Sequence, residues 1–310
     1  MRYRRFQPLA RDLSVLVLGT AWFGEATRSA AFELLDEWLA VGGNALDSAR
    51  EYGPARWGES EEVVVAWLRE RGVRSQVVLG TKGGHHRVVG VRRVNPEAVR
   101  EDLEASLATL GGRIDTYLLH RDDPAQPVEP LVDLLNEYRR DGRLGAFGAS
   151  NWRAERIAEA NAYAASAGLE GFAFSSCNLA LARQNEPPWP EAVSISDPAS
   201  RAWYAETQLP LFAWSAQALG WFSGRYSPEV DVVRVYENRE NRERRRRAQE
   251  LADAKGTDAN AVALAWVLHQ AFPTWALVGP RTVEELRRSV AALDLTLSEE
   301  ETRWLDLEEE

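Results

Sequence analysis

Residues 43–53 read GNALDSAREYG and contain the basic structural unit of the chain. A short apolar segment ends in Asp47, and Tyr52 follows five positions later in a polar stretch. The sequence GESE at residues 58–61 then opens a helical pattern that stops at Gly72, where glycine is typical of a helix C-terminus. The stretch predicts one strand–loop–helix unit, with a carboxylate and a phenol just beyond the strand.

The same unit repeats along the chain. After an N-terminal hairpin at about Tyr3–Leu9, we expect strands at Val15–Gly19, Asn44–Asp47, Gln76–Thr81, Thr116–Leu119, Ala146–Ala149, Phe172–Ser176, Leu211–Trp214 and Trp275–Val278. Amphipathic helical patterns lie between them, among them Ser29–Val41, Glu59–Arg71, Asn95–Leu110, Val128–Arg140 and Trp152–Ala167. Strand–helix alternation implies parallel strands, and eight units with right-handed crossovers predict a closed (β/α)8 TIM barrel. We expect residues 1–310 to form a single barrel domain.

The main alternative is an open, doubly wound sheet. That fold usually carries a G-x-G-x-x-G turn after its first strand, where a dinucleotide phosphate binds. Here the turn at residues 19–24 reads GTAWFG, and it lacks this pattern. The barrel is therefore favoured.

Two long connections interrupt the alternation. Ala182–Arg201 contains NEPPWP at residues 185–190, which cannot be helical, and Gly220–Asn241 follows the seventh strand. We expect both to be loops, after strands six and seven, that bind or cover a ligand. The basic run Arg244–Arg247 is flanked by glutamates, so we interpret it as a solvated helix face rather than a nucleic-acid patch.

Composition excludes several classes of protein. The chain is 45% hydrophobic and 27% charged, with a net charge of −10, which is typical of a soluble globular protein that does not bind nucleic acid or an anionic membrane. Cys177 is the only cysteine, so an intrachain disulfide is excluded, and no His, Asp or Glu spacing indicates a metal site. The apolar run Leu13–Leu18 is too short to span a membrane, and we interpret it as the first strand rather than a signal peptide. We expect a cytoplasmic protein, with a monomer as the default.

Four reactive side chains stand at expected strand ends. Asp47 ends strand two, Tyr52 follows it, Lys82 ends strand three and His120 ends strand four. The carboxyl ends of barrel strands meet at one mouth, which is where barrel enzymes have their active sites. Each residue alone has an ordinary interpretation, such as a helix N-cap for Asp47. Their joint occurrence in order predicts one catalytic site.

The four side chains suit the reduction of a carbonyl group. Tyrosine, with a pKa of about 10, is a poor proton donor unless a neighbouring cation stabilises its phenolate. Lys82 can be that cation, and Asp47 can keep a desolvated lysine charged. His120 can polarise the carbonyl oxygen or share the proton with Tyr52.

Asp47, Tyr52, Lys82 and His120 resemble the catalytic tetrad of the aldo-keto reductases, and the resemblance extends over nearly the whole chain. Within that superfamily the chain is similar to the branch of the aryl-alcohol dehydrogenases and potassium-channel β subunits. The resemblance implies a barrel enzyme that uses a nicotinamide cofactor to reduce an aldehyde, ketone or keto-sugar. It also implies that Tyr52 is the general acid, tuned by Lys82 and Asp47, and that His120 orients the carbonyl.

The resemblance further implies a set of residues that bind the cofactor. Ser150 and Asn151 match a pair that binds the nicotinamide carboxamide, although they could equally cap the next helix. Trp214 stands where an aromatic ring stacks on the nicotinamide. Gly279 and Arg281 precede a helix whose N-terminus can meet a phosphate. The full set is Gly19, Thr20, Ala21, Asp47, Ser150, Asn151, Ser176, Trp214, Ser215, Leu219, Gly220, Gly279, Arg281, Glu285 and Ser289.

Three positions depart from the family pattern. Ser176 stands where glutamine usually binds the carboxamide, and Ser289 stands where asparagine commonly contacts the adenine. Glu285 replaces a glutamine or arginine, and a carboxylate there would repel a 2′-phosphate and favour NADH. The positive charges of Arg281, Arg287 and Arg288 would instead attract a 2′-phosphate and favour NADPH. Following the family's habit, we expect NADPH rather than NADH.

The sequence does not identify the small-molecule carbonyl substrate. Trp22, Phe23, Trp189 and Trp221 are expected near the mouth, where with Tyr52 and His120 they would line an aromatic substrate site. Some of these rings could instead pack helices onto the barrel. Three alternatives remain: the same site running in reverse as an NAD(P)-dependent sugar or polyol dehydrogenase, a cofactor-binding regulatory subunit, and a barrel without redox activity.

Overall fold

The computed structural model describes residues 1–88 and 90–308. The sequence-predicted domain also includes residue 89 and residues 309–310, which lie outside the described residues. The N-terminal hairpin consists of β1 (Tyr3–Phe6) and β2 (Arg11–Ser14), which pair antiparallel. The predicted end of this hairpin at Leu9 is wrong. Residues Gln7–Leu9 form a 3-10 turn, and the second arm continues to Ser14.

Eight parallel strands close the barrel in the order β10-β3-β4-β5-β6-β7-β8-β9. They are β3 (Leu16–Gly19), β4 (Ala45–Asp47), β5 (Val78–Gly83), β6 (Ile114–Leu119), β7 (Leu144–Ser150), β8 (Ser175–Ser176), β9 (Leu211–Ala213) and β10 (Thr274–Val278). The predicted (β/α)8 barrel is confirmed, with strand ends that coincide with the predicted ones or differ from them by at most three residues.

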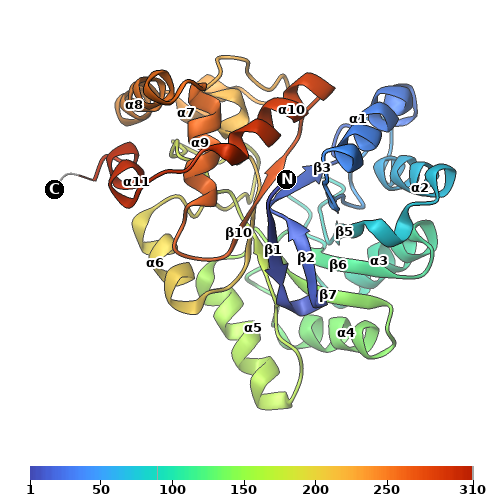
Figure 1. The fold of residues 1–310 in the computed structure, drawn as a ribbon. Coiled ribbons are helices and arrows are strands. Elements are labelled where there is room, and N and C mark those ends of the chain that lie inside the picture. The colour runs from blue at the N-terminus through green and yellow to red at the C-terminus, as the bar shows by residue number, and fades with distance from the viewer. Residues whose placement is uncertain (89, 309–310) are drawn as a thin grey trace.

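Helices surround the barrel, and the hairpin lies across its centre in the view of Figure 1. They are α1 (Arg28–Ala40), α2 (Glu59–Arg71), α3 (Pro96–Leu110), α4 (Glu129–Arg140), α5 (Ala154–Ala167), α6 (Pro198–Thr207), α7 (Val232–Tyr236), α8 (Arg239–Lys255), α9 (Ala259–Leu268), α10 (Val283–Ala291) and α11 (Glu299–Leu305). Among the described residues, none of the helices combines the length and apolar character needed to cross a lipid bilayer.

The hairpin closes the end of the barrel where the strands begin. Phe6 is fully buried, and its ring lies 5.5 Å from Phe174, 5.5 Å from Phe212 and 5.6 Å from Trp275. Edge-to-face and tilted aromatic pairs at this spacing add to the stability gained by burying the rings. Since this apolar plug fills the N-terminal end, the polar inward-facing residues are left at the opposite mouth.

The two long connections contain more helix than the sequence predicted. α6 begins at Pro198 inside the segment that we expected to be a loop to Arg201, because Asp197 caps it and proline suits the first helical turn. α7 and the first turn of α8 lie inside the predicted Gly220–Asn241 loop.

The basic run on α8 is not uniformly solvated. Arg244 is 2% exposed, and its Nη2 donates to the Asp306 backbone oxygen at 3.3 Å. Asp306, which is 3% exposed, also pairs with Arg183 at 3.0 Å and with Arg201. The interpretation of this run as a solvated face is therefore wrong for Arg244, which helps to hold α8 against the segment that follows α11.

Candidate active site

Strand geometry brings Asp47, Lys82 and His120 to one mouth of the barrel. Alternate residues of a strand face the same side, so Val78 and Lys82 both face the barrel interior, Val78 near its closed end and Lys82 near its mouth. Asp47 is the last residue of the neighbouring β4, and His120 directly follows β6, where its backbone N–H donates to Gly83 at 2.8 Å.

Lys82 lies at the centre of the group. Its Nζ donates to Asp47 Oδ2 at 2.6 Å, to the Ser48 backbone oxygen at 2.8 Å and to Tyr52 Oη at 3.3 Å. Lys82 is 2% exposed and Asp47 is 5% exposed. A buried ammonium is stable only when its donors are paired, and these three oxygens use all three of its N–H groups.

Backbone hydrogen bonds fix the loop that carries Tyr52. Ser48 N–H donates to Gly80 at 2.9 Å, and Arg50 N–H donates to Lys82 at 2.8 Å, so the loop continues along β5. Gly53 then has φ +142°, and a Cβ there would meet the Arg56 oxygen at 2.4 Å. Only glycine suits this backbone. The turn leaves the Tyr52 ring with its centroid 4.7 Å from Lys82 Nζ.

Burial and the neighbouring charges shift the pKa values of Lys82, Asp47 and Tyr52 in opposite directions. Burial tends to lower the pKa of Lys82, but Asp47 and Tyr52 outweigh it and hold that pKa above its ordinary value. Burial raises the pKa of Asp47, and the positive charge of Lys82 opposes this shift. The pKa of Tyr52 is raised because burial outweighs the ammonium beside it. The sequence predicted that the cation lowers the pKa of Tyr52, but not that desolvation raises it by more.

His120 is 5% exposed, and its ring centroid lies 5.8 Å from that of Tyr52. Burial holds the pKa of His120 well below its ordinary value, and the positive charges of Arg121 and Lys82 act in the same direction. Its imidazole is therefore neutral at pH 7. A neutral imidazole can donate one hydrogen bond to a carbonyl oxygen.

The residues predicted to bind the carboxamide lie beside His120 and already make internal contacts. Asn151 Nδ2 donates to the His120 backbone oxygen at 3.2 Å and to Ser150 Oγ at 3.1 Å. Ser176 Oγ donates to the Phe212 backbone oxygen at 2.8 Å. Asn178 Nδ2 donates to the Trp214 backbone oxygen at 3.1 Å. These bonds connect the ends of β6 to β9 into one polar rim.

The segment after β9 has an unusual backbone. Ser215, Ala218 and Leu219 have φ values of 50°, 49° and 54°, and Gly220 follows at 89°. Left-handed conformations in non-glycine residues are costly, and they cluster at ligand-binding and catalytic sites. Trp214, directly before this segment, is half-buried, and its Nε1 lies buried without a hydrogen-bond partner among the described residues.

The predicted adenosine end lies where β10 leads into α10. Arg281 N–H donates to Glu285 Oε2 at 2.8 Å, and the Arg281 guanidinium pairs with Glu229. Ser289 Oγ donates to the Glu285 backbone oxygen at 3.1 Å. Trp22 Nε1 donates to the Pro280 oxygen at 3.1 Å. The Glu285 carboxylate is therefore engaged in capping the start of α10.

The segment after β3 lies next to the group formed by Asp47, Tyr52 and Lys82. Thr20 N–H donates to the Asp47 backbone oxygen at 3.0 Å, and Thr20 Oγ1 lies 2.8 Å from Ser60 Oγ on α2. Gly19 is half-buried and Ala21 is exposed. Gly279, after β10, has open space where a Cβ would lie.

Comparison with known proteins agrees with this architecture. The family model described as Aldo/keto reductase family matches residues 15–307. The chain belongs to the aldo/keto reductase family. A norsolorinic acid reductase of Emericella nidulans is 29% identical over 96% of this chain and 79% of its own length. An uncharacterized oxidoreductase of Bacillus subtilis is 28% identical over 99% of this chain and 95% of its own length. A putative aryl-alcohol dehydrogenase of Saccharomyces cerevisiae is 26% identical over 93% of this chain and 80% of its own length.

Family membership establishes the general activity. Aldo/keto reductases use NAD(P)H and act on small-molecule carbonyl compounds, and the relatives with named activities are oxidoreductases. The chain is thus an oxidoreductase of this family.

The aromatic residues predicted at the mouth occupy different environments. Trp189 is 37% exposed, and its ring lies 5.8 Å from Trp214. Trp22 is half-buried beside Arg281. Phe23 is fully buried in the core, and Trp221 is 1% exposed with its ring stacked on Tyr226. The expectation that Phe23 lines the mouth is therefore wrong, because its ring is packed in the core.

The sequence interpretation missed charged residues around His120. Glu51 lies between His85 and His120, and Arg121 is 7% exposed directly after His120. The available signals were the position of Glu51 beside Tyr52 and the clustering of histidines. Of the four histidines, His85 and His86 closely follow Lys82. Asp122 and Asp123, which follow Arg121, pair with arginines, Asp122 with Arg156 at 3.3 Å and Asp123 with Arg92 at 2.8 Å.

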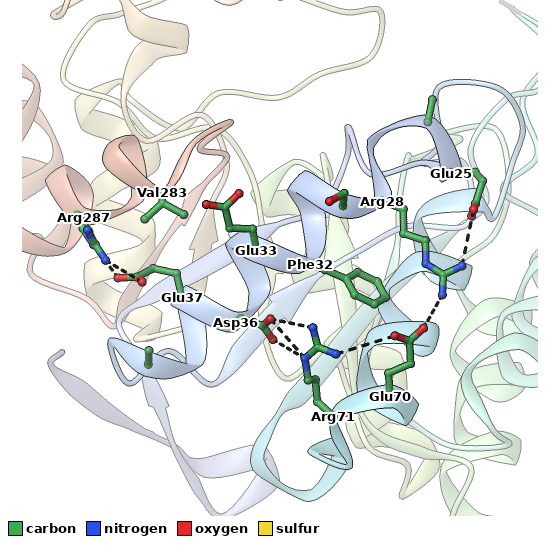
Figure 2. Close-up of a pocket in the computed structure, with 13 residues that line it drawn as sticks. Glu25, Arg28, Phe32, Glu33, Asp36, Glu37, Glu70, Arg71, Val283 and Arg287 are labelled. Carbon is green, nitrogen blue, oxygen red and sulfur yellow. Dashed lines mark hydrogen bonds and ion pairs between the residues drawn. The ribbon is translucent and has the colours of Figure 1, made fainter.

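A groove of about 1060 Å³ lies away from this site, between α1, α2 and α10 (Figure 2). Its charged side chains are largely paired with each other. Arg71 contacts Asp36 at 2.9 Å, and Arg287 contacts Glu37 at 2.8 Å. Such an arrangement connects neighbouring helices on the outside of the barrel. Within the described part of the chain, no group of three or more His, Cys, Asp or Glu side chains could hold a metal ion.

Proposed function

We propose that this protein is an NAD(P)H-dependent carbonyl reductase that converts an aldehyde, ketone or keto-sugar to the alcohol, with Tyr52 as the general acid. One observation carries the proposal. Lys82 Nζ lies 2.6 Å from Asp47 Oδ2 and 3.3 Å from Tyr52 Oη in a buried site. A phenol beside a fixed ammonium is a suitable proton donor, because the ammonium stabilises the phenolate that forms.

The chain's own residues account for the proton chemistry. Tyr52 donates its proton to the carbonyl oxygen, and Lys82 stabilises the resulting phenolate. Asp47 keeps Lys82 charged in spite of its burial. His120 donates a hydrogen bond to the same oxygen and orients the carbonyl. A bound dihydronicotinamide supplies the hydride.

The residues at the mouth fit such a cofactor. Trp214 has a half-buried ring for the nicotinamide, with a buried Nε1 that lacks a partner among the described residues. The strained segment Ser215–Gly220 is suited to following a pyrophosphate. Ser150, Asn151 and Ser176 would hold the carboxamide end. Gly19, Thr20, Ala21, Leu219, Gly279, Arg281, Glu285 and Ser289 complete the proposed set.

We further propose that NADPH binds more tightly than NADH. The exposed guanidinium of Arg281, which pairs with Glu229 near the start of α10, would exchange that partner for the 2′-phosphate. The Glu285 carboxylate, which would repel a 2′-phosphate, is held by the Arg281 N–H. Titration of the protein's intrinsic fluorescence with each cofactor measures both dissociation constants. NADH binding tenfold or more tighter than NADPH would contradict this preference.

We propose an aromatic carbonyl compound as the substrate. The exposed ring of Trp189 near Trp214 offers a flat apolar surface, and a relative is named an aryl-alcohol dehydrogenase. The decisive experiment follows cofactor absorbance with purified protein, both nicotinamides and a panel of aryl aldehydes, ketones and sugars, in both directions. Turnover of 4-nitrobenzaldehyde with NADPH is expected. Absence of turnover across the panel would refute the proposed function.

A further inference from the structure

Glu51 lies between two histidines at the mouth of the barrel. Its Oε2 contacts His85 Nδ1, and its Oε1 lies 3.6 Å from His120 Nε2. The side chains of Glu51, His85 and His120 are 18%, 13% and 6% exposed. The rings of His85 and His120 are 5.0 Å apart. This is a compact cluster in a largely desolvated place.

Three separate loops contribute to the cluster. Glu51 directly precedes Tyr52 after β4, His85 follows β5 and His120 follows β6. A second contact extends the cluster, because the centroid of the His86 ring lies 4.2 Å from that of His85, with the two rings tilted by 34°. The carboxylate of one loop therefore contacts the imidazole of His85 and lies close to that of His120, next to the proposed acid.

The tautomer of His120 has no other evident determinant. In most functional histidines, a hydrogen bond to one ring nitrogen decides which nitrogen carries the proton. Here Nδ1 of His120 is buried without a partner among the described residues. A proton on Nδ1 would leave a buried N–H donor unpaired, which is rare in proteins. A proton on Nε2 faces the negative charge of Glu51 instead.

The distance from Glu51 also matters. At 3.6 Å from Nε2, the carboxylate is too far for a hydrogen bond, but it still attracts a proton electrostatically. The closer pair is with His85, so His85 keeps the carboxylate from capturing the Nε2–H group. The donor stays free for an oxygen atom of a ligand.

We propose that the Glu51–His85 pair is a positioning device that holds the His120 proton on Nε2, so that this nitrogen can donate to the reacting carbonyl. The last clause rests on the proposed function. Glu51 and His85 act through His120 in this proposal and do not themselves touch the reacting atoms.

The direct test is nitrogen NMR of histidine-labelled protein. The chain has only four histidines, so single His→Gln variants can assign them. We expect His120 of the wild type to show the Nε2–H tautomer alone. In Glu51→Gln, which keeps the shape but removes the charge, a second population with the proton on Nδ1 should appear. An Nδ1–H tautomer in the wild type, or an unchanged spectrum in Glu51→Gln, would overturn the proposal.

Kinetics supply an independent test. Glu51→Gln should lower kcat for carbonyl reduction by about 10- to 100-fold, the loss that follows removal of the partner that orients a metal-ligating histidine. The dissociation constant of the cofactor should stay within threefold. His85→Gln should have a similar effect, and the double variant should be little worse than either single one, because both act on one proton. Additive losses would contradict a shared role.

Glu33→Gln is the matched control, since this exposed residue of α1 lies in the groove of Figure 2, away from the mouth. It should leave both the His120 spectrum and turnover unchanged. The two proposals fail in different ways. A wild type that reduces no carbonyl compound refutes the proposed function, and the NMR spectrum still decides the tautomer. If turnover and the His120 spectrum are both unchanged in Glu51→Gln, only the positioning role is refuted.

Discussion

Lys82 Nζ lies 2.6 Å from Asp47 Oδ2, and both side chains are almost fully buried at the mouth of the barrel. Each charge depends on the other, because a lone buried ammonium or carboxylate would lose its charge. Tyr52 Oη shares the same ammonium at 3.3 Å. The pair is therefore both a structural element and the proposed source of the positive charge that stabilises the Tyr52 phenolate and opposes the effect of burial on the pKa of Tyr52.

Tyr52→Phe separates these two roles. The phenylalanine ring keeps the packing against Lys82 but has no proton to donate. We expect kcat for carbonyl reduction to fall by about 10²- to 10⁴-fold, the usual contribution of a general acid. Cofactor affinity should stay within threefold, as measured by fluorescence titration. Unchanged turnover in this variant would exclude Tyr52 as the acid.

Lys82→Met should abolish activity and also destabilise the fold. Removing one partner of a buried ion pair costs roughly 3–5 kcal/mol, since the Asp47 carboxylate is left uncompensated. Urea unfolding monitored by circular dichroism measures this loss. The double variant Asp47→Leu/Lys82→Met should recover much of the stability but no activity. If the double variant is no more stable than Lys82→Met, the buried Asp47 carboxylate is not the cause of the lost stability.

The fold and the convergence of Asp47, Tyr52, Lys82 and His120 at one mouth were predictable from sequence because both follow from local regularities. Strand periodicity and helix-stop signals located the units. The carboxyl ends of neighbouring barrel strands converge, so Asp47, Lys82 and His120 could be assigned to one mouth without coordinates. The boundary between β2 and β3 was missed, because the run from Leu13 to Leu18 is apolar except at Ser14 and only Val15 separates the two strands.

Contacts between loops were not predictable in the same way. The Glu51–His85 pair joins loops after different strands, and no periodicity links the two positions. The contact of Arg244 with the Asp306 backbone spans 62 positions, from α8 to the segment after α11. Burial of Phe23 likewise depends on packing that the pattern of the turn does not specify.

Cys177 should be chemically inert in the folded protein. It is fully buried, and burial raises its pKa to about 11, whereas the thiolate is the reactive form. At pH 8 we expect Ellman's reagent to detect no thiol in the native protein and one thiol per chain in urea. Complete reaction of the native protein within minutes would show that this part of the barrel opens readily.

Asp306→Asn should destabilise the C-terminal region. The carboxylate compensates Arg183 and Arg201 directly and lies 3.7 Å from Arg244. Burial lowers the pKa of Arg244 to about 10, so this guanidinium is sensitive to the loss of its neighbouring anion. We expect a loss of roughly 3–5 kcal/mol in urea unfolding. The exposed Asp294→Asn control should change stability by less than about 0.5 kcal/mol.

His120 should make the stability of the fold depend on pH in the acidic range. Burial, with the charges of Arg121, Lys82, His85 and His86, holds the pKa of His120 well below its ordinary value. The unfolded chain, in which histidine has a pKa of about 6.5, therefore binds more protons than the folded protein below that pH. Stability is at its full value above about pH 6.5 and falls as the pH is lowered, by at most about 1.4 kcal/mol per pH unit for this group.

Urea unfolding at pH 7.5, 6.0 and 5.0 measures the slope. His86 contributes in the same direction, because burial lowers its pKa as well. The slope in His120→Gln should accordingly be smaller than in the wild type but not zero, and it should become smaller still in His86→Gln/His120→Gln. Equal slopes in the wild type and His120→Gln would mean that folded His120 takes up a proton as readily as a histidine in water. A protonated His120 would also remove the basis for assigning it a single neutral tautomer, so this measurement bears on the role of Glu51 as well.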